Sequence, residues 1–85
     1  MDRYEIARRA STLPHRFANR IPRDTLETIE LMDGGGEYDE LTIELAASLA
    51  AHKTPATPEE RDELRALLEA MNMPIDPIDQ LNVQA

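Results

Sequence analysis

The residues of this chain whose types and spacing could bind a ligand lie in one short run, DGGGEYDE, from Asp33 to Glu40. Glycine-rich runs occur in phosphate-binding loops, and glycine among carboxylates occurs in calcium-binding loops. A phosphate loop would continue with Lys and Ser or Thr, but Gly36 is followed by Glu37, whose charge repels phosphate. A calcium loop starting at Asp33 would need glycine at its sixth position, where Tyr38 stands. The run is therefore predicted to be a flexible corner between two antiparallel helices, with no metal and no cofactor.

The carboxylates around this corner offer a different chemistry, the binding of a basic partner. Acids at the start of a helix are stabilised by its dipole, and that explanation needs no partner. Alternatively they form an acidic patch in which Tyr38 is an anchor, because tyrosine is enriched at interface hot spots. Tyr38 is also expected to be half-buried in the core. The predicted partner-binding residues are Asp33, Glu37, Tyr38, Asp39, Glu40 and Glu44.

No catalytic site is predicted. His15 stands alone beside arginines, and His52 falls in the last turn of a predicted helix, where a histidine can bind free carbonyls. Serines and threonines occur without a nucleophile elbow or a Ser-x-x-Lys spacing. The acidic pair Glu59-Glu60 lies at a helix start, where the helix dipole accounts for it. We therefore expect a protein that is not an enzyme.

Composition and charge narrow the class of partner. The 85 residues suffice for a single domain, 1–85, and contain no cysteine for disulfides or thiolate metal sites. Residues 1–23 carry six arginines and two acids (6 − 2 = +4), and residues 24–85 carry three basic residues and fifteen acids (3 − 15 = −12). Such a chain repels nucleic acid and attracts basic proteins, and Arg8, Arg9, Arg16 and Arg20 are expected to pair with its own acids. Without a leader or an apolar run of roughly 18 residues, a cytoplasmic location and no membrane partner are expected.

Apolar residues at helical spacing predict two helices before the corner. The first is interrupted by Pro14, which either kinks it or ends it near Ser11, and we expect a broken helix. Its apolar face is Ile6, Ala10, Leu13 and Phe17. The second begins at Pro22 and ends at Gly34, which can take the left-handed conformation that closes helices. Its apolar face is Ile21, Thr25, Ile29 and Met32.

The strongest helical pattern spans Glu37 to His52. Its apolar stripe is Tyr38, Leu41, Leu45 and Leu49, widened by Ile43, Ala47 and Ala50. Its polar stripe is narrow and consists of Glu37, Glu40, Glu44 and Ser48. Because so much of its circumference is apolar or small, this helix is expected at the centre of the fold.

The last predicted helix opens with a capping box, formed by Thr57 as N-cap and Glu60 three residues later, with Pro58 at the first helical position. Its apolar residues are Leu64, Leu67, Leu68 and Met71. Residues 73–85 are a proline-containing tail that either turns at Asp76-Pro77 and folds back on the bundle or is frayed. No strand is expected, because alternation of apolar and polar residues is never sustained. The predicted fold class is all-α, a small bundle of three to four helices with a short C-terminal tail.

Three features of residues 26–73 form a recognisable combination. A helix ends in glycine before Glu37 and Tyr38, and a central helix carries leucine at every fourth position. PATPEE then precedes a Leu-x2-Leu-Leu-x2-Met pattern. In this combination the chain resembles the small all-helical immunity proteins of bacterial polymorphic toxin and contact-dependent inhibition systems, in particular the MafI-like group. The resemblance implies a cytoplasmic protein that binds and blocks the toxic C-terminal domain of a cognate effector, often a nuclease, through an acidic surface.

Two other functions fit the same pattern. One is a helical adaptor or regulatory subunit that dimerises through its leucine-rich face. The other is a DNA-associated antitoxin that uses the arginine-rich first segment, although the net charge of −8 argues against it.

Overall fold

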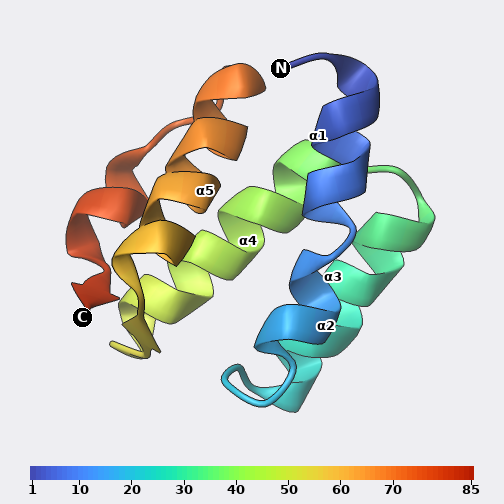
Figure 1. Cartoon of the computed structure of the whole chain (residues 1–85). Coiled ribbons are helices and arrows are strands. Elements are labelled where there is room, and N and C mark those ends of the chain that lie inside the picture. The colour runs from blue at the N-terminus through green and yellow to red at the C-terminus, as the bar shows by residue number, and fades with distance from the viewer.

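The computed structural model describes residues 1–85 and shows a small helical bundle built around one central helix (Figure 1). The helices are α1 (Arg3–Ala10), α2 (Leu13–Phe17), α3 (Arg23–Gly34), α4 (Tyr38–Ala51), α5 (Pro58–Ala70) and the 3-10 helix η1 (Asp76–Gln80). The strands are β1 (Pro55–Ala56) and β2 (Asn82–Val83). In Figure 1, α4 runs diagonally, with α1, α2 and α3 on one side and α5 and the tail on the other. The predicted all-α bundle is confirmed.

The break in the first segment is also confirmed. The helix α1 ends at Ala10, and α2 starts at Leu13 with Pro14 in its first turn, where a missing N–H breaks no helical hydrogen bond. Of the two alternatives, the structure has the separate short helix. Ala10, Leu13 and Phe17 are fully buried and Ile6 packs against the core, so the apolar face continues across the break as expected.

The helix α3 ends at Gly34, as expected. The glycine in the left-handed conformation, however, is Gly36, with φ of +70°, and not Gly34. The amide of Glu37 donates to the Met32 carbonyl at 2.8 Å, and the amide of Gly36 donates to the Asp33 carbonyl at 3.1 Å. This pair of bonds is a Schellman motif. With three glycines in succession, the sequence alone does not show which one takes the left-handed conformation. These two hydrogen bonds form around Gly36.

The helices α4 and α5 end in the same way without glycine. Lys53 after α4 has φ of 52° and Asn72 after α5 has φ of 57°. The amide of Thr54 donates to the Leu49 carbonyl at 3.0 Å, and that of Met73 donates to the Leu68 carbonyl at 2.9 Å. Asparagine tolerates this conformation better than lysine does, because its short polar side chain bonds locally.

The core lies between α4 and its neighbours. Leu41, Leu45 and Leu49 of α4 are fully buried, as are the three leucines that α5 contributes, Leu64, Leu67 and Leu68. The predicted assignment of two α4 residues is wrong. Ser48, placed on the polar stripe, is buried, and Ala47, placed on the apolar side, is exposed. The reason is that α1, α3, α5 and η1 all pack on α4, so the covered part of its surface is set by these neighbours rather than by residue type.

The last third of the chain begins with the predicted capping box and ends with an ordered tail. The Thr57 hydroxyl accepts from the Glu60 amide at 3.1 Å, and the Glu60 carboxylate accepts from the Thr57 amide at 2.9 Å. The tail turns at Asp76-Pro77 into η1, whose Ile78 is buried, and so takes the folded-back alternative. The prediction that the chain has no strand is wrong. The structure has two short strands, β1 and β2, which pair in parallel. Two-residue strands are too short to leave a periodic pattern in a sequence.

Candidate protein-binding surface

The hairpin of α3 and α4 carries a large charge that the protein itself does not balance. Residues 24–52 contain eight acids and no lysine or arginine, and none of the eight forms an ion pair. They are Asp24, Glu27, Glu30, Asp33, Glu37, Asp39, Glu40 and Glu44. All are exposed except Asp33, which is half-buried. Only solvent ions or a bound partner can offset their mutual repulsion.

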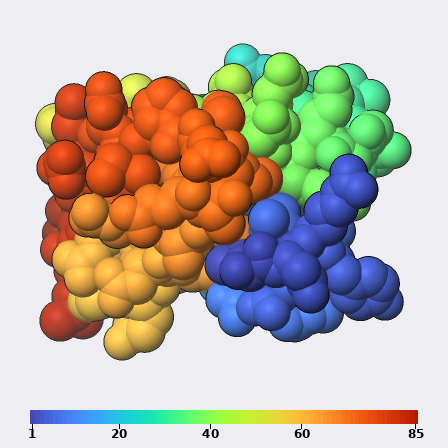
Figure 2. All heavy atoms as spheres, turned by 90° about the horizontal axis from the view of Figure 1, so that it is seen from above, coloured from blue at the N-terminus to red at the C-terminus, as the bar shows by residue number.

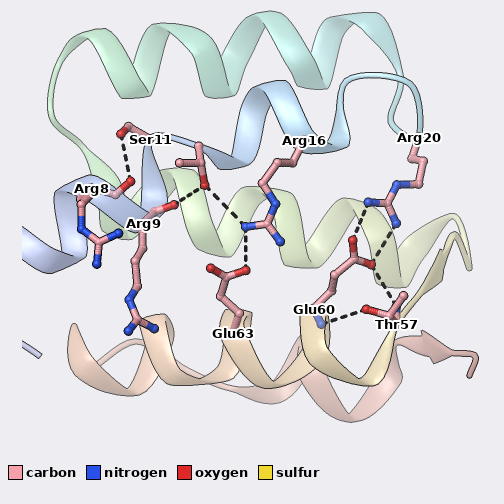
Figure 3. A network of polar contacts seen from close by, with 9 residues as sticks. Arg8, Arg9, Ser11, Arg16, Arg20, Thr57, Glu60 and Glu63 are labelled. Carbon is pink, nitrogen blue, oxygen red and sulfur yellow. Dashed lines mark hydrogen bonds and ion pairs between the residues drawn. The ribbon is translucent and has the colours of Figure 1, made fainter.

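Two arginines of residues 1–23 pair with acids of α5, and none pairs with an acid of the hairpin. Arg16 binds Glu63 at 2.7 Å, and Arg20 binds Glu60 (Figure 3). Within α1, Arg9 pairs with Glu5 at 2.6 Å. The prediction that the arginines pair with the chain's own acids is confirmed for these three, whereas Arg8 forms no ion pair. Four acids of α5 thus pair with arginines, whereas the acids of α3 and α4 have no basic partner.

Arg20 is the most tightly held of these arginines. Its Nη1 donates to Glu60 Oε1 at 2.9 Å and its Nη2 donates to Oε2 at 2.6 Å. Its guanidinium carbon lies 4.3 Å from the centre of the Phe17 ring, a cation–π distance. The hydrogen bonds from Arg20 and from the Thr57 amide, against the opposing effect of burial, lower the pKa of Glu60 to about 2. The same pairing raises the pKa of Arg20, so both groups are charged at neutral pH and join the segment after α2 to α5.

Only two of the six residues predicted to bind a partner line a groove of the protein. Tyr38 is half-buried and Asp39 exposed, and both line a groove beside α1. Glu40 and Glu44 are exposed and lie one helical turn apart on α4, away from that groove. The Glu37 carboxylate folds beside Gly35, where an added Cβ would lie 3.2 Å from its Oε2. Asp33 remains at the end of α3.

The groove is an open, mostly apolar hollow of about 660 Å³. It is lined by Arg3, Tyr4, Ile6 and Ala7 of α1, Gly36 of the corner, Tyr38 and Asp39 of α4, and Met71 after α5. The three elements meet on the face seen in Figure 2, where the blue α1 borders both the orange α5 and the green start of α4. Tyr4, Ala7 and Tyr38 also line a smaller hollow of about 320 Å³, so the groove continues past the two tyrosines.

Tyr4 is the residue of this surface that the sequence reasoning missed. The residue is 81 % exposed, which is unusual for an aromatic residue and places it among the most exposed large apolar groups of the chain. The available signal was an aromatic residue that lies off the apolar face of its own helix. That signal could not show that Tyr38, more than thirty residues later, borders the same hollow.

Neither of the two histidines lines the groove. His52 ends α4, and its Nδ1 lies 2.9 Å from the Ser48 carbonyl, to which it donates, as predicted for a histidine at a helix end. His15 is exposed on α2. No three carboxylate or imidazole side chains are grouped so that they could hold a metal ion.

None of the helices is long and apolar enough to cross a lipid bilayer. Comparison with protein-family models, with curated proteins and with solved structures found no match.

Proposed function

We propose that this chain is a binding protein without catalytic activity, whose α3–α4 hairpin docks on a basic protein domain. The observation that carries the proposal is the set of eight acids on residues 24–52, seven of them exposed and all without an ion pair. A field of one sign raises the rate of encounter with an oppositely charged surface and disfavours partners of the same sign.

The specific partner we propose is the toxic domain of a bacterial effector, which this chain neutralises in the cytoplasm as an immunity protein. The proposal takes its direction from the resemblance to small helical immunity proteins described above. A nuclease site that binds phosphate is usually basic, so a hairpin dense in carboxylates can occupy it in place of the substrate. Blocking the site in this way requires no chemistry from the inhibitor.

Charge alone does not explain tight binding, because most interface energy comes from a few buried anchors. The half-buried Tyr38 and the exposed Tyr4 are aromatic groups of the kind enriched at such anchors, and both lie where the acidic hairpin meets α1. The hairpin acids would then set the rate of association and the selectivity for a basic partner, and the tyrosines would supply most of the binding affinity.

The experiment is calorimetric titration of the purified toxin domain encoded by the neighbouring gene, at low and at high salt, with an assay of toxin activity. We expect one-to-one binding that weakens as salt rises, together with loss of activity. The double variant Glu40→Lys, Glu44→Lys should weaken binding strongly. The matched control is Asp62→Lys, Glu69→Lys, which makes the same change of net charge on α5, where the two acids form only exposed ion pairs.

Two results would reject the proposal. One is the absence of binding and inhibition, which would leave the helical adaptor as the better description, above all if sedimentation showed self-association. The other is an equal loss of binding in both double variants, because that would show a response to net charge rather than to the hairpin.

A further inference from the structure

We infer that the groove between α1, the start of α4 and the end of α5 receives an arginine side chain of the basic partner. The inference rests on the proposed function for the class of partner, and it adds the chemical identity of the anchoring group. Its basis is the combination of an apolar lining, two tyrosines and one unpaired carboxylate around the same hollow.

The lining suits the stem of a long cationic side chain. Ile6, Ala7 and Met71 offer apolar surface, and an arginine carries three methylene groups that can lie along it. Tyr4 and Tyr38 add aromatic surface on which a planar guanidinium can stack. The same chain already uses this contact inside the fold, where Arg20 lies 4.3 Å from the centre of the Phe17 ring.

Asp39 supplies the charge that such a guanidinium needs. One of its oxygens accepts a hydrogen bond of 2.8 Å from the Glu40 amide, and no basic side chain pairs with it. Arg3 lines the same groove but also forms no ion pair. The carboxylate is therefore free to bind an incoming guanidinium, while Arg3 opposes the entry of a cation.

Other side chains fit this groove less well. A glutamate or aspartate would face the repulsion of Asp39 and of the whole hairpin. A leucine or phenylalanine would fill the apolar part but would cover the Asp39 carboxylate without giving it a partner, which costs free energy. A lysine could pair with Asp39, yet its compact ammonium is more strongly hydrated and stacks less well on tyrosine.

The test uses four blocked tripeptides, Ac-Gly-X-Gly-NH2 with X as arginine, lysine, leucine or glutamate, titrated into the full chain at constant ionic strength. Binding is followed by the amide chemical shifts of the protein. We expect the arginine peptide to shift amides around the groove, those of Tyr4, Ala7, Gly36 and Asp39 in particular. Equal shifts with lysine, leucine or glutamate, or no shifts with arginine, would overturn the assignment.

Variants then separate the contributions. Asp39→Asn and Tyr4→Ala should each weaken binding of the arginine peptide by about threefold or more, and Tyr4→Phe should retain it. Removing Arg3 by Arg3→Gln should strengthen binding. The controls are Glu44→Gln and Arg23→Gln, which make the same charge changes outside the groove at residues without ion pairs, and which should have smaller effects. If the control variants changed the binding of the arginine peptide as much as the groove variants do, the inference would be overturned.

The two proposals can fail separately. If the arginine peptide binds in the groove but no toxin domain binds the chain, the groove is correct and the immunity role is rejected. If the toxin domain binds with undiminished affinity to Asp39→Asn and Tyr4→Ala, the immunity role stands and the groove as its anchor site is rejected.

Discussion

Arg20 and Glu60, forty residues apart in sequence, are joined by two parallel hydrogen bonds of 2.9 and 2.6 Å, and the guanidinium also covers the Phe17 ring. Glu60 is at the same time the third residue of α5 and the acidic member of the capping box that starts this helix. One carboxylate therefore closes the start of α5 and ties it to the end of α2. The first segment is held to the bundle by charge as well as by apolar packing.

The stability of the protein should fall in acid because of this pair. Glu60 has a pKa of about 2 in the folded state and an ordinary value of 4.5, so the folded state binds its proton less readily than the unfolded state. Its contribution is fully present above about pH 4.5 and is lost as pH falls toward 2, by on the order of 2 kcal/mol. Urea unfolding at a series of pH values measures this.

The matched variant for that measurement is Glu60→Gln, which keeps a side chain able to cap but cannot titrate. It should be less stable than the original chain at neutral pH, and the difference should shrink as pH falls below 4.5. A difference that stays constant across that range would show that Glu60 titrates normally in the folded protein.

Ser48→Ala should stabilise the protein. The hydroxyl of Ser48 is buried on α4 and has no hydrogen-bond partner, so alanine removes an unsatisfied polar group and improves helix propensity. We expect a gain of about 1 kcal/mol in the free energy of unfolding, measured with urea. The control is Ala47→Ser at the adjacent exposed position. It should destabilise the protein slightly, because serine has a lower helix propensity than alanine. A loss of stability in Ser48→Ala would mean that the hydroxyl is satisfied in solution.

The glycines of the corner should differ in their tolerance of a side chain. A methyl group added at Gly34 or at Gly36 would have no atom within 4 Å, so backbone conformation alone distinguishes the two positions. Gly36→Ala should cost about 1–2 kcal/mol because of its positive φ, whereas Gly34→Ala, inside α3, should stabilise by up to about 1 kcal/mol. Thermal unfolding of the two variants tests this, and equal effects would contradict the Schellman closure at Gly36.

Glu44→Gln should show that hairpin charge lowers the stability of the free protein. Glu40 and Glu44 are exposed like charges one turn apart, and such pairs destabilise a helix by about 0.2–0.5 kcal/mol. The variant should gain this much at low ionic strength and lose the gain in high salt, while its affinity for a basic partner falls. Unfolding at two salt concentrations measures the first effect, and a gain that persists in high salt would rule out charge repulsion as its cause.

The local elements could be predicted from the sequence because their signals are local. The capping box of Thr57 and Glu60, the break at Pro14, and the leucine spacing of α4 and α5 each depend on residues within one or two helical turns. The same is true of the unpaired charge, since no lysine or arginine occurs between Asp24 and His52. The helical class and the acidic character of the hairpin thus follow from the sequence alone.

Only the tertiary structure decided how these elements are combined into surfaces. The packing of four neighbours on α4 buries Ser48 and exposes Ala47, and it divides the six predicted residues so that Tyr38 and Asp39 border a groove while Glu40 and Glu44 do not. The meeting of Tyr4 with Tyr38, and the choice of Glu60 and Glu63 as partners of the arginines, likewise join distant parts of the chain. The physical reason is that these contacts depend on the relative placement of whole helices, and no short-range periodicity records that placement.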